Sequence, residues 1–230
     1  MPTEEEVYRL HAEQYERLIQ REDYHNHILR IVEAICPLKG LDVIDLGAGT
    51  GRVTRILAPR VGTIRAYDSS AHMLSKAQSS LMALGLGNWQ TAVADHRKIP
   101  ADDASADLVI AGWSFCYLAV WGGDTWREEL EAGYREIMRV LRPGGFVILL
   151  ETMGTGAESP KPPEHLAGYY AWLAEKKFKT SWIRTDYRFK SLEEAAELTK
   201  FFFGKKLGRE VEAKKWIILP ECTGVWTLKK

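Results

Sequence analysis

Short apolar segments alternate with longer amphipathic segments over the first two thirds of the chain. Five segments, most of them strongly apolar and bounded by turn residues, are typical of strands; they cover residues 41–46, 62–67, 89–94, 106–112 and 145–151. Apolar residues at helical spacing mark residues 28–35, 74–84 and 126–141 between or before them. The alternation predicts an α/β fold, in which helices cover both faces of a mostly parallel sheet.

The two ends of the chain extend this pattern. Thr3 and Glu6 match a capping box that opens an N-terminal helix, along which Tyr8, His11, Tyr15 and Leu18 share one face. After the fifth strand, Gly and Pro residues in 154–163 predict a loop. The pattern then predicts an aromatic helix around 169–173, a strand over 180–189, a helix capped by Ser191 and Glu194, and a last strand over 223–228.

Composition and charge narrow the class of protein. The 230 residues hold 31 Lys and Arg against 31 Asp and Glu, and this zero net charge argues against a nucleic-acid partner. The longest apolar run, 146–150, is far shorter than the roughly 18 residues that span a bilayer. Three widely spaced cysteines supply neither a disulfide framework nor a metal knuckle, and the acidic N-terminus is unlike a signal peptide. We expect a cytoplasmic protein with no metal and no membrane span.

The most informative segment is a glycine-rich loop between the first strand and a helix. Asp45 is followed by Gly47, Gly49 and Gly51, and glycines allow sharp turns and close approach of a ligand to the backbone. A dinucleotide-binding loop would carry a third glycine at the position that Arg52 occupies here. The loop therefore predicts a ligand site of a different kind, in which Asp45 orders the loop or accepts from a ligand amine.

This loop resembles motif I of the class I S-adenosylmethionine-dependent methyltransferases. Later segments are similar to further motifs of that family in the same order: Asp68 after the second strand, Asp95 and His96 after the third, residues 107–114, and residues 140–146. Carboxylates at the ends of neighbouring parallel strands converge on the crevice where open α/β sheets bind ligands. The series spans residues 41–151, about half of the chain.

The resemblance implies a Rossmann-like, doubly wound, mostly parallel seven-stranded sheet with an antiparallel last strand. N-terminal helices and an inserted cap complete the expected fold. We expect one domain over residues 1–230, divided into an N-terminal helical lid (1–38), a cofactor-binding core (39–153), a linker and cap helix (154–179), and finishing strands and a helix (180–230).

The resemblance also implies S-adenosylmethionine as cofactor, with S-adenosylhomocysteine as product. The cofactor-binding residues it implies are Tyr15, Asp45, Gly47, Ala48, Gly49, Gly51, Asp68, Ser69, Met73, Asp95, His96, Ala111 and Trp113. Structural alternatives remain for several of them. The glycines can serve a tight turn, the aspartates can cap helices, and Tyr15 or Met73 can be ordinary helix packing.

Overall the chain most resembles the ubiquinone/menaquinone-biosynthesis methyltransferase-like group, which implies a small-molecule acceptor. Residues 112–115 lack the Asn- or Asp-Pro-Pro-aromatic motif of enzymes that methylate base or side-chain amino groups. Candidate residues of the substrate pocket are Tyr8, His11, Tyr117, Glu151 and Arg184. No catalytic base is assigned. An RNA or protein methyltransferase and a non-catalytic S-adenosylmethionine-binding protein are the alternatives, and the chain is expected to be a monomer or a homodimer.

The neutral total conceals a division of charge. Residues 1–160 hold 16 basic and 22 acidic residues, whereas residues 161–230 hold 15 and 9. Solvated helix faces explain such a basic segment in ordinary terms. The alternative hypothesis is that Arg184 and Arg188 attract an anionic acceptor.

Overall fold

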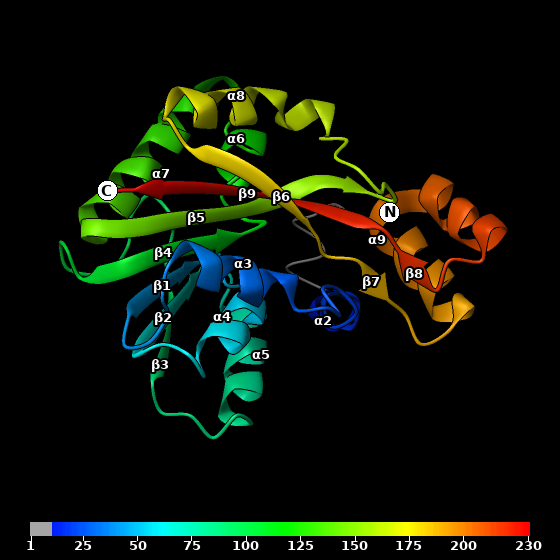
Figure 1. Ribbon diagram of the computed structural model, residues 1–230, viewed down its shortest axis with the longest axis horizontal. Helices are drawn as coiled ribbons and strands as arrows, with labels where there is room; N and C mark the ends of the chain where they lie inside the picture. The colour runs from blue at the N-terminus through cyan, green and yellow to red at the C-terminus, as the bar shows by residue number, and fades with distance from the viewer. Residues whose placement is uncertain (1–10) are drawn as a thin grey trace.

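A single sheet organises the protein, whose structure is a computed structural model that describes residues 11–230 (Figure 1). Thr3, Glu6 and Tyr8, named above, lie outside the described residues. The seven-stranded sheet has the order β3-β2-β1-β4-β5-β9-β6. Its strands are β1 (Asp42–Leu46), β2 (Thr63–Asp68), β3 (Trp89–Val93), β4 (Ala106–Gly112), β5 (Leu141–Thr155), β6 (Lys179–Arg184) and β9 (Glu221–Lys229).

Strand directions confirm the predicted fold class. Neighbouring strands among β1 to β5 pair in parallel, and β9 pairs antiparallel with both β5 and β6. The last strand is therefore the antiparallel one, inserted between two strands that precede it in the chain. The ends of β1, β2 and β4 carry the glycine loop, Asp68 and Gly112 to one edge of the sheet, because parallel strands end on the same side.

Helices pack on both faces of this sheet (Figure 1). The described helices are α2 (Ala12–Ile19), α3 (His27–Ile35), α4 (Arg52–Leu57), α5 (Ala71–Met82), α6 (Tyr117–Val120), α7 (Trp126–Val140), α8 (Ala167–Glu175) and α9 (Leu192–Lys214). Of these, α9 lies beyond the end of the sheet and packs in a separate apolar cluster with Leu18, Tyr187 and Leu219. One core cluster joins alternate strand residues such as Val43 and Ile110 to α3 and α4. A second joins Ile44 and Val109 to α7 and α8. The nearly all-apolar strands are explained by this burial on both faces.

The C-terminal part differs from the prediction of one strand over 180–189. The chain leaves the sheet after Arg184, and β7 (Tyr187–Arg188) instead pairs with β8 (Ile218–Leu219) in a separate two-stranded sheet. The Asp186 carboxylate accepts both from the Arg184 guanidinium and from the Glu221 backbone, which fixes this turn. The helical run α9, capped by Ser191 as predicted, is interrupted at Gly204 (φ 88°, ψ 169°).

Candidate functional site

The glycine loop between β1 and α4 has a backbone that side chains would obstruct. Gly47, Gly49 and Gly51 have φ values of 67°, 56° and 83°. A Cβ atom at Gly47 would lie 2.3 Å from the Cβ of Ser114, which is far inside van der Waals contact. The loop thus requires glycine both for its left-handed conformation and for its close packing.

Asp68, at the end of β2, holds this loop from the side. One carboxylate oxygen accepts from the Gly49 backbone N–H at 2.8 Å, and the other accepts from the Ser70 N–H at 2.7 Å. Burial raises the pKa of Asp68, and the two backbone donors act in the opposite direction. The carboxylate combines this structural role with a position on the wall of a cavity.

A cavity of about 690 Å³ opens where the glycine loop and the ends of the strands meet. Nine of its lining residues are predicted site residues: Tyr15, Gly47, Gly49, Asp68, Ser69, Asp95, His96, Trp113 and Tyr117. The structure therefore brings together residues that are up to 102 positions apart in the chain (from Tyr15 to Tyr117). The lining residues that were not assigned to the site are Ser70, His72, Arg97, Gly112, Ser114, Leu118, Trp121, Gly122, Thr125 and Glu129.

Half of the unassigned lining residues come from the segment between β4 and α7. The sequence pattern shows no sign of the short helix α6, so the turn of the chain at this point could not be placed. Aromatic composition was the available signal. Tyr117 and Trp121 stack with ring centroids 4.4 Å apart, and Trp121 is 56% exposed at the cavity.

Other predicted cofactor residues lie behind the cavity wall. Asp45 is buried, accepts from the Thr54 hydroxyl and has a pKa that burial raises to about 7. The Ala48 N–H donates to the Tyr67 carbonyl, and Gly51 packs against α5. Met73 and Ala111 are fully buried; the Met73 methyl would lie 3.6 Å from a Cβ at Gly49. These residues shape the loop from beneath rather than line the cavity.

Three of the predicted substrate residues that the structure describes, His11, Glu151 and Arg184, do not line this cavity. His11 contacts Phe201, with ring centroids 5.2 Å apart. Glu151 is buried and accepts from the Cys116 N–H at 3.0 Å and the Tyr169 hydroxyl at 3.1 Å. Burial raises the pKa of Glu151 to about 7.

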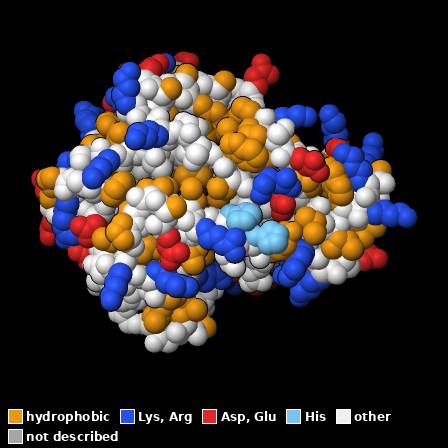
Figure 2. Space-filling model, viewed as in Figure 1, with side chains coloured by type: hydrophobic (Ala, Val, Ile, Leu, Met, Phe, Trp, Pro, Cys, Tyr) orange, Lys and Arg blue, Asp and Glu red, His pale blue; other side chains and the backbone are white. Residues whose placement is uncertain are grey.

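Arg184 lies in a separate surface groove of about 430 Å³, which His27, Arg30, Ile31, Trp182 and Ile183 also line. Figure 2 shows histidine and basic side chains gathered near the middle of this face, over α3 and β6. The groove lies apart from the cavity, because the two share no lining residue. Arg184 is therefore not among the residues that line the cavity.

His96 is a neutral imidazole at the cavity. Its Nε2 lies 3.4 Å from the Ser114 Oγ, and that hydroxyl donates to the Leu46 carbonyl at 2.8 Å. Burial lowers the pKa of His96 to about 4. Because the Ser114 hydroxyl donates its proton to the Leu46 carbonyl, the Ser114 oxygen can only accept from His96. This assigns the proton of the His96 ring to Nε2.

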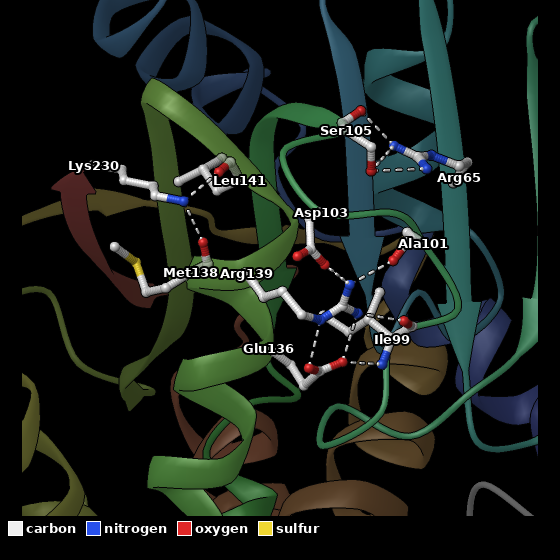
Figure 3. Close-up of polar contacts among 10 residues, drawn as sticks. All are labelled: Arg65, Ile99, Ala101, Asp103, Ser105, Glu136, Met138, Arg139, Leu141 and Lys230. Carbon is white, nitrogen blue, oxygen red and sulfur yellow. Dashed lines mark hydrogen bonds and ion pairs between the residues drawn. The ribbon is translucent and has the colours of Figure 1, made fainter.

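The loop that carries Asp95 and His96 to the cavity is fixed to α7 (Figure 3). The Arg139 guanidinium pairs with Glu136 and Asp103 and donates to the Ile99 and Ala101 carbonyls. The Glu136 carboxylate also accepts from the Ile99 N–H at 2.8 Å. These contacts give the loop, which lacks a strand of its own, a defined position.

Residues 11–230 contain neither a cluster of metal-binding side chains nor a membrane-spanning helix. No group of three or more His, Cys, Asp or Glu side chains in this part of the chain is arranged to hold a metal ion. None of the described helices has both the length and the apolar character needed to cross a membrane.

The segment that forms much of the cavity is similar to known proteins. Residues 43–145, which contain the glycine loop and the ends of β1 to β4, match the model of a family described as a methyltransferase domain. The malonyl-[acyl-carrier protein] O-methyltransferase of a Marinomonas species is 33% identical over 138 residues, which cover 59% of this chain and 47% of that protein. The ubiquinone/menaquinone biosynthesis C-methyltransferase UbiE of Rubrivivax gelatinosus is 31% identical over 122 residues, covering 53% and 43%.

The chain thus spans about half the length of the curated relatives it matches. Among solved structures, a SAM-dependent methyltransferase from Aquifex aeolicus superposes with a TM-score of 0.58 at 18% identity, over 86% of this chain and 87% of that one. At this identity the likeness concerns the fold alone. It extends beyond residues 43–145 and agrees with the order and direction of the strands.

Proposed function

We propose that this chain, whose residues 43–145 match a family described as a methyltransferase domain, transfers a methyl group from S-adenosylmethionine to a small-molecule acceptor. The observation that carries the proposal is the contact between Asp68 and the glycine loop. It places a carboxylate beside the left-handed backbone of Gly49, at the wall of a cavity of about 690 Å³.

The residues present fit such a cofactor. At the glycine loop, Asp45 Oδ1 and the Thr50 hydroxyl are buried and have no hydrogen-bond partner among the described residues. Neither atom lines the cavity, so the fit rests on the groups at its wall: the backbone of Gly47 and Gly49 and the Asp68 carboxylate. The space that a Cβ at Gly49 would fill is bounded by Met73 and Tyr15, which leaves close access to the backbone.

Each part of the cofactor has a candidate partner. The glycine loop would contact the methionine portion, the Asp68 carboxylate would accept from the ribose hydroxyls, and the segment of Asp95 and His96 would contact the adenine. Tyr15, from α2, would close over the methionine end. Burial raises the pKa of Tyr15 to about 12, so its hydroxyl keeps its proton and can donate to an anion.

The bound cofactor supplies an activated methyl group on a sulfonium. Transfer is an in-line displacement, for which the protein mainly provides proximity, orientation and exclusion of water. The part of the cavity that Trp113 and Tyr15 line contributes an apolar wall of this kind. His96 is neutral at physiological pH, and no residue is assigned as a catalytic base.

The acceptor is proposed to be flat or apolar. The stacked rings of Tyr117 and Trp121 and the side chain of Leu118 supply apolar surface at one end of the cavity. The relatives are named for an acyl group on a carrier protein and for ubiquinone or menaquinone biosynthesis, and neither name refers to a nucleic acid. This favours a small-molecule acceptor over the RNA and protein alternatives.

Turnover tests the proposal. The full chain is incubated with methyl-labelled S-adenosylmethionine and a panel of quinols, phenols and carboxylic acids, and S-adenosylhomocysteine is quantified by mass spectrometry. We expect product formation with at least one acceptor and none with the Gly47→Ala variant. Binding of the cofactor without product on any acceptor would support the non-catalytic alternative instead.

A further inference from the structure

Trp113 lines the cavity in an unusual backbone conformation. Its φ is 52°, in the left-handed region that bulky residues seldom adopt. Its N–H donates to the Leu150 carbonyl at 2.6 Å, which anchors the backbone to β5. Such outliers persist only where the surroundings hold them, and they gather at functional sites.

Arg52 holds the side chain of this tryptophan. The centre of its guanidinium lies 3.8 Å from the centroid of the Trp113 ring. The same guanidinium donates to the Glu22 carboxylate at 2.6 Å, and the two side chains are only 12% and 3% exposed. Arg52 is the first residue of α4, directly after Gly51, so the glycine loop and the tryptophan share one support.

Glu22 connects this support to the C-terminal part of the chain. Its carboxylate accepts from the Thr185 hydroxyl at 3.1 Å and from the Tyr187 hydroxyl. Burial raises the pKa of Glu22, whereas Arg52 opposes that shift. A buried ion pair of this kind adds little to stability, because the cost of desolvating the two charges offsets their attraction. Apolar residues of similar size would fill the same space at least as well, so packing alone does not explain the pair.

We propose that Arg52 is a positioning residue, which acts through Trp113 to fix the cavity wall that faces the cofactor and acceptor. The inference rests on the proposed function, and it adds a role for the residue that stands where dinucleotide-binding loops have glycine. The planar guanidinium is essential to this role, because an ammonium can pair with Glu22 but cannot lie flat on an indole.

The test uses the full chain labelled with 5-fluorotryptophan, and the Trp113→Phe variant identifies the fluorine signal of Trp113. Fluorine NMR and calorimetric titration with S-adenosylhomocysteine are applied to Arg52→Lys and to Glu22→Gln. The matched control is Arg55→Lys, because Arg55 lies on the same helix, pairs with Glu16 at 2.8 Å and contacts no aromatic ring within residues 11–230. Melting temperatures are recorded for all variants.

We expect Arg52→Lys to shift or broaden the Trp113 signal and to weaken binding of S-adenosylhomocysteine roughly tenfold, the scale of one desolvated cation–π contact. Glu22→Gln should move the same signal, and it carries the test if Arg52→Lys does not fold. Arg55→Lys should leave the signal and the affinity within twofold of wild type. A lower melting temperature with an unchanged Trp113 signal and unchanged affinity would overturn the inference.

The two proposals can fail separately. If the wild-type chain does not bind S-adenosylhomocysteine, the proposed function fails, while the Trp113 signal of the unliganded variants still reports on the contact with Arg52. If the wild type binds and both Arg52→Lys and Glu22→Gln match it in affinity and signal, only the positioning role is wrong.

Discussion

The left-handed backbone of Trp113 allows a direct test of stored strain. The variants Trp113→Ala and Trp113→Gly lose the same indole, and they differ in whether a Cβ remains at a φ of 52°. An L residue pays about 1–2 kcal/mol in this region. Glycine loses about 0.5–1 kcal/mol through its greater freedom in the unfolded chain. The difference leaves the glycine variant more stable than the alanine variant by roughly 0.5–1 kcal/mol.

Urea denaturation measures this difference, and thermal unfolding should show the glycine variant melting about 2 °C higher, given about 2–4 °C per kcal/mol for a chain of this size. Ala171 provides the control, since it is exposed within the helix α8. There the change Ala171→Gly should lower stability by about 1 kcal/mol. An alanine variant at position 113 that is more stable than the glycine variant would refute the strained conformation and weaken the role assigned to Arg52.

Three further predictions follow from particular contacts. Gly47→Ala should abolish binding of S-adenosylhomocysteine in a calorimetric titration, because its Cβ would collide with Ser114, whereas Gly40→Ala, with a φ of 81° and open space, should leave affinity unchanged. The raised pKa of Glu151, about 7, means that the folded protein keeps a proton that the unfolded chain loses between pH 4.5 and 7, so the free energy of unfolding should fall as the pH rises through this range. In Glu151→Gln this fall should be smaller by about 3 kcal/mol, as measured by urea denaturation at each pH. Ser191→Ala should cost about 1 kcal/mol of unfolding free energy by removing the cap on Glu194, and an unchanged value would contradict that contact.

The core of the fold was predictable because local and global preferences agree there. Apolar strands that are buried on both faces leave a clear pattern, and parallel strands separated by helices permit few arrangements. The glycine loop and Asp68 could be placed together from spacing alone, because each follows a strand and those strands end at the same edge of the sheet.

The positions of Glu151 and Arg184 could not be predicted, because contacts with residues distant in the chain decide them. Glu151 was expected at the end of a strand, but β5 continues to Thr155 and Glu151 pairs with Gly224 within it, so the carboxyl is directed to Tyr169 instead of the cavity. Arg184 ends the edge strand β6 and pairs with Asp186. No local pattern reveals either arrangement.

The structure does not place Arg184 and Arg188 where the hypothesis of an anionic acceptor requires them. Arg184 lies in the surface groove, and the Arg188 guanidinium lies 4.9 Å from the ring centroid of Tyr24. Neither residue lines the cavity. The left-handed conformation of Trp113 was also beyond sequence reasoning, because an aromatic residue gives no signal for it.

Titration of the purified full chain with S-adenosylmethionine tests the central claim most directly. The wild type should bind at one site, and Asp68→Asn should bind at least tenfold more weakly, as expected for loss of charge-assisted hydrogen bonds of about 1.5–3 kcal/mol. Asp107→Asn is the matched control, because Asp107 lies near the opposite end of β4 and pairs with Arg142. Equal affinity in Asp68→Asn and wild type, or no binding by the wild type, would contradict the account.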